Sequence, residues 1–480
     1  TWDDGTPITA ADMAFTLKVI KNPLVNTPHK RLYFDFVEDI YLYPEDPKKF
    51  TLKLAFPYIQ SEEAFGQFEI LPRHILDPDG ELDVYTLPQL DNPNLKVDSE
   101  SELAKFAQRY NSAPYGRDPQ WITGSGPYTL TEWSSGQQLV FTRKQDWWAQ
   151  DLEGTPFQAY PERVVYKVIP DPNTAAIALQ NQELDVYADI PGRDFVKMNQ
   201  NEDLKQHFNL YTPNMFVYSY MGLNMQPPAG RAPYFADRRV RRAFAHLLDM
   251  DQLIETVNYG YAERTTGPVF PMEKSRYDST LPPIAFDLEK AAALLEEAGW
   301  RDNDGDGIRE KMLEGQTVPF RCELLLHEGN KQRESLSLIL KENAQKVGCE
   351  VEIVKVDWSL FLERTTQHQF DLIYGAWAGG PAPQDLKQIW HSSMHQGGSN
   401  FIGFGSPESD ALIERIRRTN DPEVYNPLYR EFHRLVYEEQ PYIFMMVSQN
   451  KLAIHKRFRN AQPSMLRPGF FATRFWTPEN

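Results

Sequence analysis

The segment RDNDGDGIRE, residues 301–310, carries the residue types and spacing of a calcium-binding loop. Asp302, Asp304 and Asp306 stand where such a loop places its first carboxylates. Ile308 could add a main-chain carbonyl, and Glu310 occupies the position of a further acidic ligand. The sequence therefore offers a set of oxygen ligands for a structural Ca²⁺.

The same segment departs from a calcium loop at its end. The position that needs an acid binding through both oxygens is Leu313, and Glu314 follows one residue late. A helical sequence precedes the turn and a strand-like sequence follows it, so the segment is not an EF-hand. Two interpretations stay open, a structural Ca²⁺ or an Asp-Gly turn without metal. Either way the turn is a local feature and not a calcium-signalling module.

Motifs of catalysis are missing from the sequence. It contains no nucleophile elbow, no phosphate-binding loop and no Gly-rich dinucleotide turn. His391 and His395 stand four residues apart, a spacing that can bind a metal on a helix, but no neighbouring residue completes a ligand set. We therefore expect a protein that is not an enzyme and that has no cofactor apart from the alternative Ca²⁺.

Size and charge exclude several partners. A chain of 480 residues suggests several domains, and 24% charged residues is ordinary for a globular protein. The formal net charge of −17 argues against binding to nucleic acid or to anionic membranes. No apolar run approaches the roughly 18 residues that a membrane span needs. The first residues do not read as an export signal, so we expect any such signal or lipid-anchoring segment to lie outside this chain.

The sequence predicts elements of an α/β protein. Residues 8–20 read as a helix with Thr9 as its cap, and residues 124–133 and 137–143 read as a strand hairpin. Residues 163–169, 173–182 and 183–190 read as a β-α-β unit whose first strand is buried. A second unit is clearer, with strands at 320–326 and 349–356 around a helix at 331–348. Cys322 and Cys349 each open a strand of that unit, which favours two buried thiols over a disulfide.

Several stretches resemble one family in the order of the chain. They are WDDGTPITAADMAFTL (2–17), GSGPYTLTEW (124–133), ALQNQELDVYADI (178–190), FADRRVRRAFAHLLDMDQLI (235–254), FDLEKAAALLEEAGW (286–300), FDLIYGAWAGG (370–380) and GGSNFIGFGSPESDALI (397–413). Together they resemble the extracytoplasmic solute-binding proteins of family 5, the oligopeptide/dipeptide type, which supply ABC importers.

The resemblance implies an α/β fold of the type II periplasmic binding protein kind (cluster C), with two hinged α/β lobes and a smaller inserted lobe. The expected division is residues 1–122 for the inserted lobe, 123–260 plus 458–480 for the first α/β lobe, and 261–457 for the second. Family members usually have more chain before the DGTP turn, so the resemblance also implies that the first strands of the first α/β lobe are absent from this chain.

The resemblance places the ligand beside the strand that ends in Trp377. Tyr374, Trp358, Gly379 and Gly380 are expected as ligand contacts on the same edge of the binding site, and Asn400 and Phe401 in the loop opposite. Peptide-binding members carry an Asp at the place of Gly380, where it pairs with the ammonium of the ligand, and Asp385 stands five residues further on. A buried ammonium without a counter-charge is costly, so the site should not favour a free peptide N-terminus. Thr365 and Tyr374 occupy the places of basic residues that hold the peptide C-terminus, with Arg364 adjacent to one of them.

The expected function is the periplasmic or other extracytoplasmic substrate-binding component of an ABC transporter. It would act as a monomer, bind an oligopeptide or a similar polar solute between its lobes, and dock on a permease in the inner membrane. Two alternatives remain: a sensor of the same fold that presents a signal peptide to a receptor, and a hydrolase on a similar scaffold.

Overall fold

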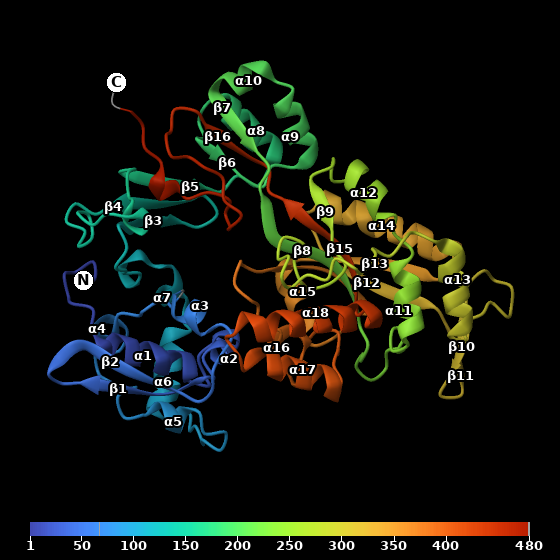
Figure 1. The fold of residues 1–480 in the computed structure, drawn as a ribbon, viewed down its shortest axis with the longest axis horizontal. Helices are drawn as coiled ribbons and strands as arrows, with labels where there is room; N and C mark the ends of the chain where they lie inside the picture. The colour runs from blue at the N-terminus through green and yellow to red at the C-terminus, as the bar shows by residue number, and fades with distance from the viewer. Residues whose placement is uncertain (67, 479–480) are drawn as a thin grey trace.

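The computed structural model describes residues 1–66 and 68–478, and its largest element is a six-stranded mixed sheet (Figure 1). The strands lie in the order β13-β12-β14-β8-β15-β9, with β12 parallel to β13 and β14 and the remaining pairs antiparallel. Their bounds are β8 Asn214–Leu223, β9 Ala262–Arg264, β12 Arg321–His327, β13 Glu350–Val356, β14 Leu372–Ala378 and β15 Tyr442–Gln449.

Helices and one hairpin surround this sheet. They are α11 Arg238–Ala245, α12 Met250–Thr256, α13 Leu288–Glu297, α14 Lys331–Lys346, α15 Trp358–Thr366, α16 Lys387–Trp390, α17 Pro407–Arg417 and α18 Pro422–Glu439, with the hairpin β10 Glu310–Leu313 and β11 Gln316–Pro319. The predicted unit over residues 320–356 is confirmed as β12, α14 and β13. Leu336 and Leu340 of α14 are buried against the sheet, because apolar residues recur along one face of the helix.

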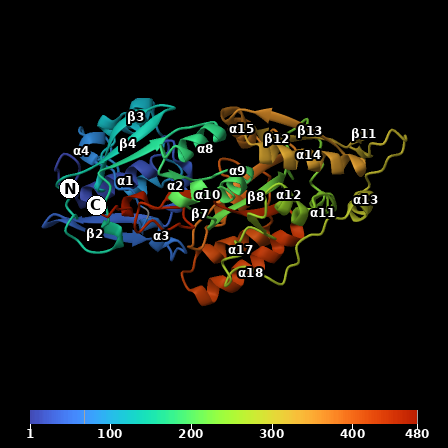
Figure 2. The same ribbon diagram turned by 90° about the horizontal axis from the view of Figure 1, so that it is seen from above.

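The N-terminal part of the chain forms a lobe of its own. It contains α1 Ala10–Lys21, α2 Pro28–Tyr33, β1 Val37–Tyr43, β2 Asp46–Leu54, α3 Ser61–Gly66, α4 Arg73–Leu76, α5 Leu87–Leu90, α6 Glu102–Tyr110 and α7 Ala113–Arg117. The predicted cap of the first helix is confirmed, because the Thr9 amide donates to Asp12 Oδ2 at 2.8 Å in a capping box. Figure 2 shows this lobe at the end of the molecule opposite β10 and β11.

The protein contains two further sheets, each of three strands. One contains β3 Tyr128–Ser134, β4 Gln138–Arg143 and β5 Arg163–Lys167, and β3 and β4 confirm the predicted hairpin. The other has the order β6-β16-β7, with β6 Val186–Tyr187, β7 Phe208–Tyr211 and β16 Leu452–His455. Helices α8 Pro172–Gln180, α9 Gly192–Asn199 and α10 Glu202–His207 accompany the second sheet (Figure 1).

The predicted β-α-β unit over residues 163–190 is wrong. β5 pairs antiparallel with β4, and β6 belongs to the other three-stranded sheet, so the two strands share no sheet. The predicted burial of β5 is also wrong, since Val165 and Tyr166 are exposed. An apolar run shows that a strand is compatible with burial but does not show which sheet it joins.

Strand pairing differs from the expected lobe boundaries. β8 pairs with β14 and β15 in the large sheet, although residues up to 260 were expected in the first α/β lobe. β16 pairs with β6 and β7, although it falls inside the range expected for the second lobe. We propose a division that follows the sheets, with residues 123–211 and 452–478 in the first α/β lobe and residues 214–449 in the second.

The chain crosses between those two lobes twice, after β7 and after β15. The crossings lie side by side, because the Asn450 amide donates to the Pro213 carbonyl at 2.9 Å. The buried Asn450 side chain also donates to the Pro468 carbonyl at 3.0 Å and accepts from the Asp189 amide at 3.0 Å. A pair of adjacent crossings is a natural hinge between lobes.

No helix in the described residues is long and apolar enough to cross a bilayer.

Candidate ligand-binding site

Four aromatic rings lie nearly parallel at the carboxyl end of β14, and we call them the aromatic ledge: Tyr220, Trp377, Phe401 and Tyr442. Trp377 lies between Tyr220 and Phe401, with ring centroids 6.1 Å away on both sides and interplanar angles of 13° and 17°. Tyr220 stacks on Tyr442 at 3.8 Å. Trp377 Nε1 donates to the Tyr442 hydroxyl at 3.2 Å, so the indole is held by its edge and by both neighbours.

A glycine makes room for the ledge. A Cβ at Gly375 would lie 2.5 Å from Cζ of Tyr220, so only glycine at this position lets the tyrosine ring lie under Trp377. Burial raises the pKa of Tyr220 and of Tyr442 well above the usual tyrosine value. Both hydroxyls therefore stay neutral and can only act as hydrogen-bonding groups.

One edge of β14 is free next to the ledge. The Gly379 amide donates to the Phe216 carbonyl at 2.8 Å, which sets the register with β8. Main-chain groups alternate between the two edges of a strand, so those of Ala376 and Ala378 point away from β8. On that side the pairing with β12 ends at Ile373, and no described strand pairs with the exposed Ala376 and Ala378.

Trp358 stands where this free edge begins. It is the first residue of α15, it is 53% exposed, and its ring lies 5.2 Å from that of His327, the last residue of β12. Because the carboxyl ends of parallel strands meet at one border of a sheet, Trp358 and Trp377 share the border at which α/β proteins commonly bind ligands. The sequence also predicted both residues for this border.

Tyr374 and Asn400, also predicted as ligand contacts, are enclosed. Tyr374 is 4% exposed and has the Arg333 guanidinium over its ring at 5.7 Å. The Asn400 side chain donates to the carbonyls of His391 and Phe404 and accepts from the Phe404 amide at 3.0 Å. Their side chains thus support the strand and the loop that carry Trp377 and Phe401, and a direct role in binding stays a prediction.

Gly379 and Gly380 differ in their surroundings. A Cβ at Gly379 would lie 1.9 Å from Gln384 Nε2 and 2.9 Å from the Phe270 ring, so a larger residue here would displace the Gln384 side chain and press on that ring. Gly380 has open space around the position of a Cβ. The place where the resemblance implies an Asp in peptide-binding members is therefore roomy and is occupied by an uncharged residue.

Two charged residues that could neutralise the end of a peptide, Asp385 and Arg364, are already paired. Asp385 accepts from Arg417 Nε at 2.8 Å and from the Tyr58 hydroxyl at 2.8 Å, and its side chain is fully buried. Arg364 pairs with Glu323 at 2.5 Å and donates to the Gln369 carbonyl. Neither residue is free to neutralise the end of a peptide.

Tyr220 and Tyr442 were missed by sequence reasoning. Both stand in apolar strand segments, YSYMGL and YIFMMV, where an aromatic residue cannot be told from a core residue. The signal that could have found them is Gly375, a glycine inside a strand, where it often marks the close approach of another group.

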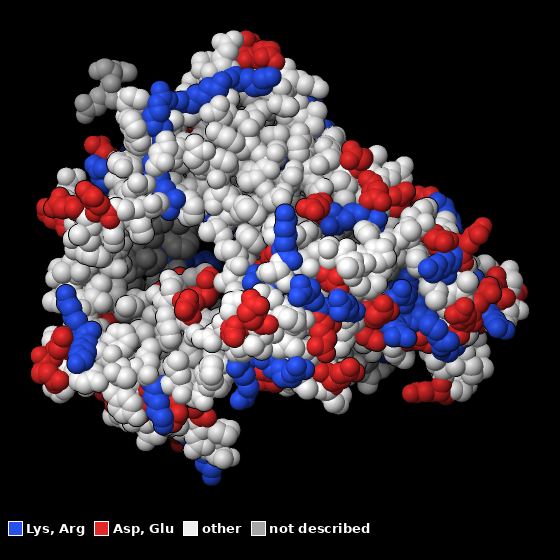
Figure 3. Space-filling model, in the orientation of Figure 1, with Lys and Arg blue, Asp and Glu red and all other residues white. Residues whose placement is uncertain are grey.

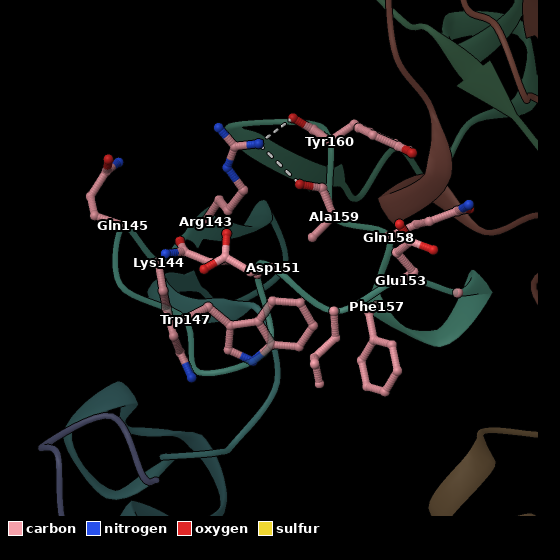
Figure 4. Close-up of a pocket in the computed structure, with 13 residues that line it drawn as sticks. Arg143, Lys144, Gln145, Trp147, Asp151, Glu153, Phe157, Gln158, Ala159 and Tyr160 are labelled. Atoms are coloured by element: carbon pink, nitrogen blue, oxygen red, sulfur yellow. Dashed lines mark hydrogen bonds between the residues drawn. The ribbon is translucent and has the colours of Figure 1, made fainter.

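A cavity also lies elsewhere, in the loop between β4 and β5. It has a volume of about 590 Å³ and is lined by Arg143, Lys144, Trp147, Phe157 and Tyr160, among others (Figure 4). Arg143 donates to the carbonyls of Ala159 and Tyr160, and Lys144 pairs with Asp3. This cavity contains none of the predicted ligand residues.

The predicted calcium turn is exposed and partly satisfied by its own main chain. Carboxylate oxygens of Asp302, Asp304 and Glu310 lie within 4.8 Å of one another. Asp302 accepts from the amides of Gly305 at 2.7 Å and Gly307 at 3.0 Å. Asp306 accepts from the Ile308 amide at 2.7 Å. These bonds can stabilise the turn without an ion, and both interpretations of the turn, with and without Ca²⁺, stay open.

The surface is hollowed between the lobes. Figure 3 shows a recess bordered by the N-terminal lobe, by the sheet that contains β3 and by the region of α16, with acidic side chains along its lower rim. The molecule therefore offers space between its parts for a ligand.

Comparisons with known proteins give the family. The description that matches residues 1–399 is "Bacterial extracellular solute-binding proteins, family 5 Middle". The oligopeptide-binding protein AppA of Bacillus subtilis is 29% identical over 356 residues, 74% of this chain and 62% of the relative. The nickel-binding periplasmic protein of Escherichia coli is 26% identical over 341 residues, 68% of this chain and 61% of the relative. The chain thus matches less than two thirds of the length of both relatives.

Solved structures agree in fold. The structure of AppA from Bacillus subtilis with a nonapeptide superposes with a TM-score of 0.79 at 24% identity, covering 100% of this chain and 85% of that one. NikZ from Campylobacter jejuni with Ni(L-His) gives 0.73 at 20% identity, covering 96% and 81%. The match over most of the chain and the shared architecture establish that this protein belongs to the bacterial extracellular solute-binding proteins of family 5 and has their type II periplasmic binding protein fold.

Proposed function

We propose that this protein is the substrate-binding component of an ABC importer and that it captures an extended oligopeptide. The observation that carries this proposal is the free edge of β14 beside the aromatic ledge. An extended peptide can add to such an edge as a further strand, with its main chain bonded to Ala376 and Ala378. Trp377 and Trp358 would then supply flat surfaces for its side chains.

The charges narrow the class of peptide. Gly380 leaves the site without the carboxylate that would neutralise a ligand ammonium, and Asp385 is already bonded to Arg417 and Tyr58. A buried ammonium without a partner is costly. The preferred ligand is therefore an internal segment of a longer peptide, or a peptide with a blocked N-terminus.

The relatives support a peptide ligand and also suggest an alternative, a nickel complex. One relative is an oligopeptide-binding protein and the other is a nickel-binding protein. The strand edge favours peptide, since a compact metal chelate would leave the main-chain groups of Ala376 and Ala378 unused. We also place the protein outside the cytoplasm, as a monomer that docks on a membrane permease.

A strand-edge variant tests the proposal. Ala378→Pro removes a main-chain donor from the free edge without touching the bonds to β8, whereas Ala378→Val adds bulk and keeps the donor. The ligands are a mixture of N-acetylated nonapeptides, the same mixture with free N-termini, and nickel–histidine, measured by calorimetry and native mass spectrometry. We expect the acetylated peptides to bind best. Ala378→Pro should lower their affinity about 5- to 10-fold, which corresponds to the loss of one hydrogen bond.

Other outcomes identify other functions. Binding of nickel–histidine alone, unaffected by Ala378→Pro, would replace the peptide proposal with metal-chelate capture. Cleavage of the nonapeptides would indicate a hydrolase. Co-purification with a receptor and not with a permease would indicate a sensor.

A further inference from the structure

We propose that the N-terminal lobe is part of the ligand site, because Tyr58 and Gln60 hold in place the loop that follows Trp377. We call this loop, residues 379–385, the ledge loop. The inference rests on the proposed function in one respect, namely that the ledge loop borders the ligand. The contacts that support it do not depend on the identity of that ligand.

The ledge loop has little structure of its own. Its sequence, GGPAPQD, contains two glycines and two prolines, and none of its residues lies in a helix or strand. Such a segment is positioned by the groups that its main chain meets, because it has no ladder of internal hydrogen bonds.

Two residues of the N-terminal lobe meet the ledge loop directly. Gln60 Nε2 donates to the Pro383 carbonyl at 2.7 Å, and the Tyr58 hydroxyl donates to Asp385 Oδ2 at 2.8 Å. Tyr58 is 1% exposed, and its ring stacks on Phe36 at 4.7 Å. The donor to Asp385 is therefore fixed by the core of the N-terminal lobe.

A buried arginine extends the same connection. Arg417 of α17 pairs with Asp385 at 2.8 Å and with Asp35 of the N-terminal lobe at 3.1 Å, and its side chain is 1% exposed. Its guanidinium also lies 5.3 Å from the centre of the Tyr58 ring, and its carbonyl accepts from the Ile59 amide at 2.9 Å. Asp385 is thus anchored by both lobes at once.

The second lobe holds the rest of the loop. Gly379 is bonded to Phe216 of β8, Arg276 donates to the Pro381 carbonyl at 3.1 Å, and the Tyr429 hydroxyl donates to the Gln384 carbonyl. The second lobe thus holds Gly379, Pro381 and Gln384, the N-terminal lobe holds Pro383, and both lobes hold Asp385. Removal of the N-terminal supports should therefore loosen the loop around Pro383 and leave Gly379 in place.

The chain supplies a matched control. The Tyr33 hydroxyl donates to Gln388 Oε1 at 2.9 Å, which is also a bond from the N-terminal lobe to the second lobe but not to the ledge loop. Tyr33→Phe and Tyr58→Phe each remove one hydroxyl that crosses between the same two lobes. Only Tyr58→Phe removes a hydrogen bond to the ledge loop.

The mobility of the loop is measured with a spin label at Ala382→Cys, which is partly exposed. Cys322 and Cys349 are free but buried, so the label reacts at the introduced thiol. A second label at the exposed Gln396→Cys reports on the same lobe away from the loop. Each label is combined with Tyr58→Phe, Gln60→Ala and Tyr33→Phe.

We expect Tyr58→Phe and Gln60→Ala to add a fast component to the spectrum at residue 382 and to leave the spectrum at residue 396 unchanged. Tyr33→Phe should change neither. The same two variants should bind the acetylated nonapeptide mixture about fivefold more weakly, the effect of one lost hydrogen bond. An immobile label at 382 in both variants, or equal loosening at 382 and 396, would overturn the inference. A mobile loop in a protein that binds no peptide would instead count against the proposed function alone.

Discussion

At the level of single residues, the indole of Trp377 differs from a core tryptophan in how it is held. Its Nε1 is fixed by Tyr442 and its ring lies between two others, but the residue is not fully buried, and the exposed Ala376 and Ala378 flank it in the strand. A rigid aromatic surface next to free main-chain groups is suited to an extended peptide, because it loses little conformational entropy on binding.

We predict that Trp377→Ala weakens binding of the nonapeptide mixture about tenfold, since ring stacking contributes roughly 0.5–1.5 kcal/mol per pair. Trp377→Phe should retain most of the affinity, because a ring still stacks there. Trp148→Ala, in an exposed tryptophan of the β4–β5 loop, is the control and should bind as the natural protein does. If calorimetry gives the same affinity for all three variants, the aromatic ledge is not part of the binding site.

His433 makes the stability depend on pH. Burial lowers its pKa from 6.5 to about 4, with Asp278 and Thr266 opposing the shift and Arg434 adding to it. Its Nδ1 accepts from the Asp278 amide at 3.2 Å, so the neutral ring carries its proton on Nε2, beside Thr266 Oγ1. Between pH 6.5 and 4 the unfolded chain binds a proton that the folded protein does not bind.

We therefore predict that this group removes stability as the pH falls through that window, by up to about 3 kcal/mol, and that the loss levels off below pH 4. Urea unfolding at pH 7 and pH 4.5 measures it, as the difference between the natural protein and His433→Gln. The variant should lose less stability between the two pH values. Parallel losses in both proteins would show that His433 contributes nothing.

At the level of elements, the β12-α14-β13 unit shows what the sequence could predict. Its helix has apolar residues on one face and its strands are joined through that helix, so local pattern and tertiary arrangement agree. The segment over 163–190 has a similar local pattern, but β5 joins β4 in a different sheet, and only tertiary pairing decides that.

In the candidate site, too, the features set by local sequence could be predicted and those set by tertiary pairing could not. Trp377 and Trp358 stand at the ends of elements that the resemblance aligned, so their border could be predicted from the sequence. Tyr220 and Tyr442 could not, because their role depends on β8 and β15 lying beside β14 and on the space left by Gly375. The enclosure of Asn400 depends likewise on the folding of its loop around the side chain.

The two thiols of this unit provide a prediction. Cys322 and Cys349 are free, as the sequence favoured, and burial raises the pKa of both well above the usual thiol value. We predict that neither reacts with a thiol-specific disulfide reagent in the folded protein and that both react in urea. Rapid reaction of one thiol under native conditions would mean that the sheet opens at that strand.

The acidic turn between α13 and β10 provides a further prediction, on metal binding. Because its carboxylates accept from amides of the same turn, we predict that a chelator leaves the melting temperature unchanged. The measurement compares chelator, Ca²⁺ and Mg²⁺ in the natural protein and in Asp304→Asn. A rise in melting temperature with Ca²⁺ alone, abolished by Asp304→Asn, would establish the calcium site instead.

At the level of the whole molecule, the lobes are connected unequally. One hydrophobic cluster joins Phe36 and Tyr58 of the N-terminal lobe to Trp390 and Phe432 of the second lobe, and the buried Arg417 crosses the same boundary. The main-chain connections between the two α/β lobes are instead the adjacent crossings at Pro213 and Asn450. Since breaking a buried ion pair is costly, the N-terminal and second lobes should stay together.

We therefore predict a closing motion in which the N-terminal and second lobes move as one body against the first α/β lobe. Spin labels at the exposed Lys48→Cys and Glu408→Cys should keep their distance when peptide is added, whereas labels at Glu408→Cys and Asp203→Cys should approach one another. Small-angle scattering of the unlabelled protein should show a smaller radius of gyration on binding. If the first distance changes as much as the second, the contacts of Arg417 open during closure, and the N-terminal lobe cannot then hold the ledge loop in both states.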